Sequence, residues 1–289
     1  MFSIVPHQKQ YKTYTLSDDS ANASLDVVPE RGGIVTRWSV QGQELLYLDE
    51  ERFANPKLTV RGGIPILFPI CGNLPHDSYT YQQRTYHLKQ HGFARDLPWS
   101  VKELTTEGCA AITLVLNSNE QTRAVYPWDF ELVFTYQIKG NALEIIQHYT
   151  NHGEEVMPFS TGLHPYFGTP DKSQLRFEIP ATKYRDQRTK EVDYFIGTFD
   201  TEQDEVDVAL EQLTGLAATA IDAGRKLRLI LCYNSTYSTV VFWTLKGKDY
   251  YCLEPWSAPR NAMNTGKHLI YLRPGETSQT LVRISATFF

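Results

Sequence analysis

Residues 130–150 read FELVFTYQIKGNALEIIQHYT, and this stretch decides the fold class. Apolar and polar side chains alternate through residues 130–138 and again through residues 142–150. This period of two is typical of strands with one buried face. The short connection at residues 139–141 (KGN) contains glycine, as the turns between antiparallel strands often do. The sequence therefore predicts a β-hairpin over residues 130–150.

The same strand period recurs on both sides of this hairpin, at residues 110–118, 226–233, 238–245 and 280–289. Few stretches show the helical spacing of apolar residues, and residues 205–213 (EVDVALEQL) fit either a helix or a strand. Many short strands separated by Gly, Pro and Asn favour an antiparallel sandwich over alternating βαβ units. No low-complexity linker or repeat of fixed period divides the chain. We therefore expect an all-β fold, a large antiparallel β-sandwich, in which residues 1–289 form a single domain.

Net charge and hydropathy limit the kinds of partner that this chain can have. The formal net charge is −5, and the local basic runs alternate with acids. Without a basic stripe that could neutralise phosphates, we expect no nucleic-acid partner. Residues 1–18 contain no apolar core of the kind found in signal peptides. No run approaches the roughly 20 apolar residues that a membrane helix needs. We expect a cytoplasmic protein with no membrane partner, and the sequence predicts no oligomeric state.

The cysteines and histidines show no metal-ligand pattern. The four cysteines are scattered without CxxC spacing, at Cys71, Cys109, Cys232 and Cys252. His148 and His152 have the i, i+4 spacing of a helical metal pair, but the residues around them read as a strand that runs into a turn. The sequence therefore predicts reduced cysteines and no metal site.

Four separated segments combine Gly and Pro with charged residues and histidines. Such punctuation is typical of turns and strand ends, where binding and catalytic groups are often placed. The segments are RGGIPILFPICG (61–72), QHGFAR (90–95), TGLHPYF (161–167) and YCLEPW (251–256).

Glu254 and His164 are the candidate acid–base pair in these segments. Each precedes a proline, Pro255 or Pro165, so each is expected at the end of a strand. Apolar neighbours would raise the pKa of Glu254, and a nearby carboxylate would raise the pKa of His164 above about 6.5. An ionised Glu254 and a protonated His164 could then coexist near neutral pH. The alternatives are an exposed glutamate and a structural histidine.

His91, Arg61 and Arg95 are the candidate binding residues in the first two segments. Gly92, directly after His91, allows the backbone to approach a ligand closely. The arginines offer planar guanidinium donors to hydroxyl, carboxylate or phosphate oxygens. The alternative for each arginine is a salt bridge between strands.

Taken together and in this order, the four segments resemble the aldose 1-epimerase (mutarotase) family of the galactose-mutarotase-like superfamily. The resemblance implies a β-supersandwich fold and interconversion of the α and β anomers of an aldohexose without a metal or organic cofactor. It places Glu254 at the family's general base and His164 at its general acid. Arg61 and His91 match its sugar-binding positions, and Asp207 matches an aspartate that binds sugar hydroxyls.

Two branches of the family remain open for the substrate. Residues 61–72 and 90–95 resemble the hexose-6-phosphate mutarotases, whereas residues 254–260 (EPWSAPR) are more similar to the branch that acts on free sugars. The expected ligand is thus an aldohexose or an aldohexose 6-phosphate. The alternative function is a non-catalytic carbohydrate-binding protein on the same fold, although a binder would have no need of the pair formed by Glu254 and His164.

Overall fold

The computed structural model describes residues 1–289, and the predicted hairpin is its longest regular element. Strand β11 (Phe130–Lys139) pairs with β12 (Ala142–Asn151) in one unbroken antiparallel register. Buried and half-buried residues alternate along both strands, as the period of two requires. The prediction for residues 130–150 is confirmed.

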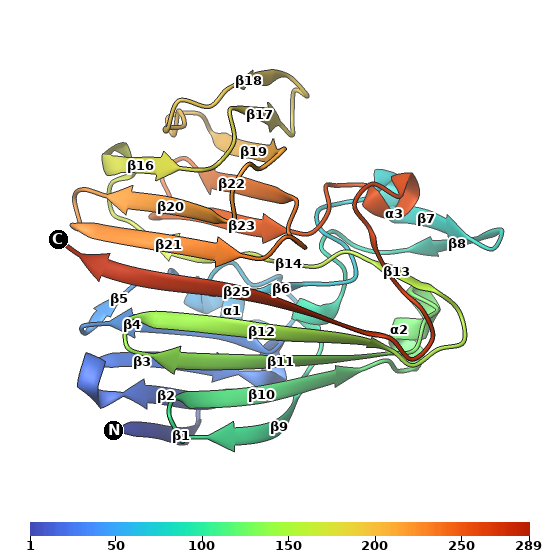
Figure 1. Ribbon diagram of the computed structural model, residues 1–289, viewed down its shortest axis with the longest axis horizontal. Coiled ribbons are helices and arrows are strands. Elements are labelled where there is room, and N and C mark those ends of the chain that lie inside the picture. Colours follow the sequence, from blue (N-terminus) through green and yellow to red (C-terminus); the bar gives the residue numbers. More distant parts are fainter.

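This hairpin forms the middle of an eight-stranded sheet, which Figure 1 shows as one continuous layer. The C-terminal strand β25 (red in Figure 1) lies directly beside β12. The other predicted strands of this sheet, at residues 110–118, 226–233 and 280–289, are confirmed. In spatial order the sheet contains β16 (Leu175–Glu178), β20 (Ala217–Asp222), β21 (Leu227–Tyr233), β25 (Thr277–Phe288), β12, β11, β10 (Ala110–Asn117) and β9 (Ser100–Thr105).

A five-stranded N-terminal sheet packs against one half of this layer. Its strands β2 and β3 contact β10 and β11, and in Figure 1 the blue strands lie behind the green ones. The strands follow one another in chain order: β1 (Phe2–Gln8), β2 (Lys12–Asp18), β3 (Ala23–Val28), β4 (Ile34–Val40) and β5 (Gln43–Glu44).

The third large sheet contains residues 205–213, whose type the sequence left open. They form strand β19 rather than a helix. Residues 238–245 form β22, as expected. The spatial order is β18 (Val192–Tyr194), β17 (Lys183–Asp186), β19 (Glu205–Glu211), β22 (Thr239–Leu245), β23 (Tyr250–Trp256), β14 (Gly162–Leu163) and β6 (Ile66–Leu67), and β15 (Tyr166–Gly168) also pairs with β23.

The remaining elements are short. Two strand pairs stand apart from the large sheets: β7 (Ser78–Tyr81) with β8 (Arg84–His87), and β13 (Met157–Phe159) with β24 (Ile270–Leu272). The α-helices are α1 (Glu50–Ala54), α2 (Glu120–Val125) and α3 (Ala262–Thr265). The 3₁₀ turns are η1 (Asp19–Ala21), η2 (Pro29–Arg31), η3 (Pro75–Asp77), η4 (Ala94–Asp96) and η5 (Lys172–Gln174). None of the helices has the length and apolar character needed to cross a lipid bilayer.

One hydrophobic core connects the three large sheets. Trp38 on β4, Phe134 on β11 and Phe242 on β22 are fully buried members of the same contact cluster. This continuity is what the single-domain prediction requires, because separate domains would each have a core of their own.

Candidate active site

A pocket of about 270 Å³ brings all six predicted site residues together. The residues come from distant parts of the chain: from the loop before β6, the turn after β8, η4, the β14–β15 connection, β19 and β23. The six are Arg61, His91, Arg95, His164, Asp207 and Glu254. Half of the other lining residues are polar or charged, and the other half are apolar or aromatic.

Glu254 lies inside strand β23, not at its end. The strand continues through Pro255 to Trp256, and all seven of its residues are buried. The expected position of Glu254 at a strand end is therefore wrong, and so is the alternative of an exposed glutamate, since Glu254 is only 1% exposed. Its Oε2 accepts a hydrogen bond from Nε1 of Trp256, at 3.0 Å.

Pro165 and Pro255 lie at a break in strand pairing and do not mark the end of β23. Strand β15 pairs with the start of β23 and β14 pairs with its last residue, which leaves the middle of β23 unpaired on that side. His164 lies in the connection between β14 and β15, as its predicted place near a strand end required. Because Pro255 has no N–H group, it loses no ladder hydrogen bond at this gap.

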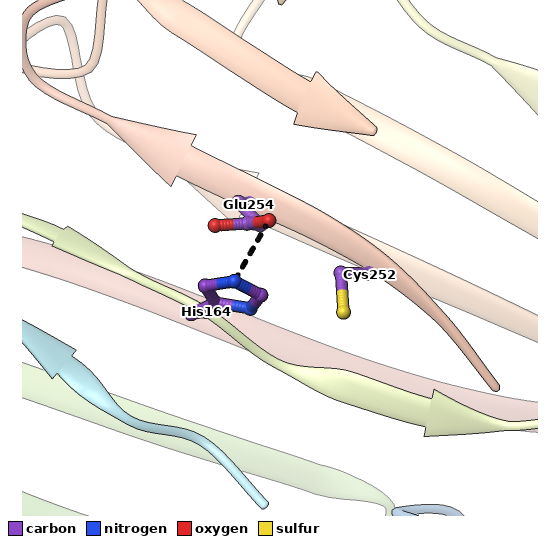
Figure 2. A group of neighbouring side chains, drawn as sticks. All are labelled: His164, Cys252 and Glu254. Atoms are coloured by element: carbon purple, nitrogen blue, oxygen red, sulfur yellow. Dashed lines mark ion pairs between the residues drawn. The ribbon is translucent and has the colours of Figure 1, made fainter. Parts of the chain in front are cut away.

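His164 faces Glu254 across this gap. Nε2 of His164 lies 3.3 Å from Oε1 of Glu254, and Figure 2 shows the glutamate extending from β23 toward the imidazole. The His164 ring stacks on Tyr166, with ring centroids 4.7 Å apart. Its Nδ1 is buried without a hydrogen-bond partner.

Burial favours the uncharged forms of both residues. It raises the pKa of Glu254 well above the ordinary value. Burial, together with the positive charge of Arg95, lowers the pKa of His164 to about 3. The expectation that the carboxylate raises the histidine pKa is wrong, because the loss of water and the nearby arginines outweigh that attraction. Burial thus disfavours both the ionised carboxylate of Glu254 and the protonated imidazole of His164.

His91 is fixed by its neighbour Gly72. The N–H of Gly72 donates to Nδ1 of His91 at 3.1 Å, so the other ring nitrogen, Nε2, carries the proton. Burial lowers the pKa of His91 well below its ordinary value and keeps the ring a neutral donor. Gly92 has φ +69°, and a Cβ there would lie 2.2 Å from the carbonyl oxygen of Phe68. Gly92 therefore allows a close approach to the backbone of Phe68, and the predicted approach to a ligand stays a prediction.

Arg61 and Arg95 form no salt bridge, so that alternative is wrong for both. The Arg61 guanidinium lies 5.4 Å from the centre of the Trp243 ring. Arg95 donates to the carbonyl oxygen of Gln90 at 2.8 Å, while its Nε is buried without a partner. Both arginines thus retain donors for an incoming ligand.

Asp207 projects into the pocket from β19, and its side chain is 13% exposed. One nitrogen of Arg260 donates to both of its carboxylate oxygens, at 3.0 and 2.7 Å. Burial raises the pKa of Asp207 above the ordinary value, and Arg260 opposes that shift.

The sequence as a whole matches a known family. A family model described as aldose 1-epimerase matches residues 12–285. The chain belongs to the aldose 1-epimerase family. The crystal structure of the Slr1438 protein from Synechocystis sp. PCC 6803 is similar, with 46% identity, a TM-score of 0.95 and 99% of each chain covered. A provisionally named glucose-6-phosphate 1-epimerase from Cenchrus ciliaris is 26% identical over 285 residues, which cover 88% of this chain and 79% of that protein.

The structural comparison confirms the predicted fold. The galactose 1-epimerase from Lactobacillus acidophilus NCFM has 17% sequence identity and a TM-score of 0.78, with 100% of this chain and 99% of that chain covered. At this identity the similarity shows the fold alone. The expected galactose-mutarotase-like β-supersandwich is therefore correct for this member of the aldose 1-epimerase family.

Sequence reasoning about this family member missed several pocket residues. Trp243, Trp256, Tyr166 and Arg260 all line the pocket and contact predicted site residues. Trp256 and Tyr166 lay within the quoted segments, where an aromatic side chain beside a charged residue was the available signal. Trp243 lies on β22, whose strand pattern is ordinary, and nothing in the sequence distinguished it.

One group of three side chains, two of which line the pocket, has the spacing of a candidate metal site. Ligand atoms of His164, Cys252 and Glu254 lie within 4.8 Å of one another, and Figure 2 shows the three side chains. A metal would need the cysteine as a thiolate. Burial raises the pKa of the Cys252 thiol well above its ordinary value, and Glu254 adds to that shift. The donor set therefore fits a metal ion poorly.

Proposed function

We propose that this protein is an aldose 1-epimerase that interconverts the α and β anomers of an aldohexose by opening and closing the sugar ring. The proposal is carried by one observation, the buried contact of 3.3 Å between Glu254 and His164 in a polar pocket. Membership of the aldose 1-epimerase family supports it.

We propose that Glu254 and His164 share a single proton, which suits the reaction. Opening a hemiacetal requires a base that takes the proton of the anomeric hydroxyl and an acid that protonates the ring oxygen. Transfer of the shared proton from Glu254 to His164 produces such a base and acid without uptake of a proton from water. Glu254 then removes the hydroxyl proton while His164 protonates the ring oxygen, and the C1–O5 bond breaks.

The open-chain aldehyde then rotates about the C1–C2 bond and presents its other face to the C5 hydroxyl. Ring closure reverses both proton transfers, so the pair returns to its starting state with one proton. No electron or group is gained or lost over the cycle. Arg61, His91 and Asp207 hold the sugar hydroxyls during opening, so that the aldehyde remains bound until it closes.

Arg95 extends the site toward a phosphorylated sugar. It lines the main pocket and also an adjoining cavity of about 350 Å³, which Lys57 and Lys89 line as well. Three cationic side chains at one end of the pocket complement a phosphate group. The similarity to the Cenchrus ciliaris protein supports the same substrate. We therefore propose an aldohexose 6-phosphate as the preferred substrate.

The alternative is a carbohydrate-binding protein with no turnover. A pure binder gains nothing from a buried carboxyl–imidazole pair, whose burial costs free energy. The geometry thus favours an enzyme over a binding protein.

The test is the rate of α-to-β conversion of glucose 6-phosphate, free glucose and free galactose, each followed with and without catalytic amounts of the protein. We expect acceleration that is largest for glucose 6-phosphate. The Arg95→Ala variant should raise KM for the phosphosugar roughly tenfold and leave KM for glucose nearly unchanged, since a charge-assisted hydrogen bond is lost. Arg84→Ala on strand β8 serves as the matched control.

Acceleration of none of the three sugars would contradict the enzyme and favour the binding protein. Equal effects of Arg95→Ala on phosphorylated and free glucose would contradict the phosphate-binding role alone.

A further inference from the structure

Arg260 lines the pocket and makes polar contacts with Asp207 and Asn73. It follows β23 in the chain, and its side chain is 19% exposed. In addition to its contacts with Asp207, it donates from its other terminal nitrogen to the side-chain oxygen of Asn73, at 3.0 Å. Its guanidinium thus joins the third sheet to the loop that follows β6.

Arg260 also packs against two residues that support other site residues, Trp256 and Gly72. Its guanidinium lies 5.5 Å from the centre of the Trp256 ring, and Trp256 is the hydrogen-bond donor to Glu254. Its stem covers Gly72, where a Cβ would lie 2.4 Å from Cγ of Arg260. Gly72 in turn holds the ring of His91.

We propose that Arg260 is the positioning residue of this pocket: it orients the Asp207 carboxyl group toward the sugar, and it fixes Trp256 and Gly72, which align Glu254 and His91. The inference rests on the proposed function, in which Asp207 binds sugar hydroxyls. Arg260 reaches Glu254 and His91 only through these neighbours, so its effect on the reaction is indirect.

Charge explains why Asp207 depends on Arg260. Glu205 on the same strand and Asp186 on β17 both raise the pKa of Asp207. Arg260 is the one cation that makes an ion pair with it. Without Arg260, burial and these two acids would act together and raise the pKa of Asp207 further.

The test compares Arg260→Met with Arg260→Lys. Methionine keeps an unbranched stem against Gly72 but removes the charge and the guanidinium over Trp256, whereas lysine keeps the charge without the planar fork. We expect Arg260→Met to raise KM roughly tenfold to a hundredfold, with a smaller change in kcat. The acid limb of kcat/KM should move to higher pH, because Asp207 then takes up a proton at higher pH. Lysine should restore the acid limb in part.

A double-mutant cycle with Asp207→Asn gives the sharpest readout. If Arg260 acts through Asp207, Arg260→Met should have little further effect on KM in the Asp207→Asn background. Arg188→Met is the control, because Arg188 pairs with Asp186 at an exposed position. Effects that multiply in the double variant, or an acid limb that stays in place in Arg260→Met, would overturn the inference.

A carboxyl NMR titration of Asp207 separates this inference from the proposed function. A higher pKa of Asp207 in Arg260→Met than in the wild type supports the positioning role even if the wild-type protein turns over no sugar. An unchanged pKa overturns that role even if the enzyme is active.

Discussion

Strands β12 and β23 lie in different sheets of the same molecule, and each carries a glutamate. Glu144 on β12 is half-buried, whereas Glu254 on β23 is fully buried. On β12, buried and half-buried positions alternate, and Glu144 faces outward with Arg283 at 3.7 Å. On β23 every residue is buried, and Glu254 faces inward with Trp256 and His164 as its polar neighbours. The first strand supports the fold, and the second also carries the proposed chemistry.

This difference teaches where to look for function in a β-sandwich. A charged side chain that follows the alternation stays in water and needs no special partner. A carboxyl group that is buried against the pattern is costly unless it is hydrogen-bonded, and its pKa rises. At Glu254 burial raises the pKa well above that of an ordinary carboxyl group, whereas Glu144 is half-buried beside Arg283.

The largest expected effect comes from His164→Asn, which removes one partner of the proposed pair. Loss of a positioned acid or base typically lowers the catalytic rate about 10²–10⁴-fold, and we expect kcat to fall within that range. His148→Asn on β12 is the control, since His148 is a half-buried histidine of the other sheet. A rate of anomer conversion in His164→Asn equal to that of His148→Asn would remove His164 from the mechanism.

The next effect should be on stability and not on rate. Leu114 on β10 is fully buried in the main core, whereas Val115 beside it faces the other side of the strand. We expect Leu114→Ala to lower the free energy of unfolding by about 2–5 kcal/mol because it leaves a cavity, and Val115→Ala to cost far less. Chemical denaturation measures both.

The kcat of folded Leu114→Ala should stay close to the wild-type value, because no β10 residue lines the pocket. A loss of kcat as large as that of His164→Asn would mean that the two sheets are not functionally distinct.

The smallest effect is the pH dependence of kcat/KM. The pair fails when it gains a second proton or loses its only one, so the profile should be bell-shaped. Burial lowers the pKa of His164 to about 3 and raises that of Asp207 above its ordinary value, so the acid limb should report Asp207 and not a free imidazole at about 6.5. The raised pKa of Glu254 places the alkaline limb well above that of an ordinary carboxyl group. An acid limb at about 6.5 would indicate an ordinary, solvated histidine.

The sequence was sufficient for the architecture because alternation is a local property. Residues 130–150 carry the period of two without interruption, and their register follows from it. The sequence did not decide the secondary structure of residues 205–213, because the spacing of their valines and leucines fits both the helical and the strand period. Pairing with β22 settles the type there, and such long-range contacts leave no trace in the local pattern.

The sequence predicted which residues form the site, but it predicted their burial and pKa values less well. Pro165 and Pro255 flagged His164 and Glu254, although the prolines mark a gap in pairing inside the sheet. The sequence did not predict that the pKa of His164 is lowered. Burial and the nearby Arg95 cause this shift, and both depend on contacts that form only in the complete fold.

The central claim is that Glu254 exchanges protons with the sugar, and one comparison tests it most directly. The rate of glucose 6-phosphate anomer conversion should be measured for Glu254→Gln and Glu144→Gln, with sugar binding followed by calorimetry. We predict that Glu254→Gln binds the sugar but loses about 10²–10⁴-fold in kcat, while Glu144→Gln matches the wild type in both. Anomer conversion by Glu254→Gln at the wild-type rate would contradict the account.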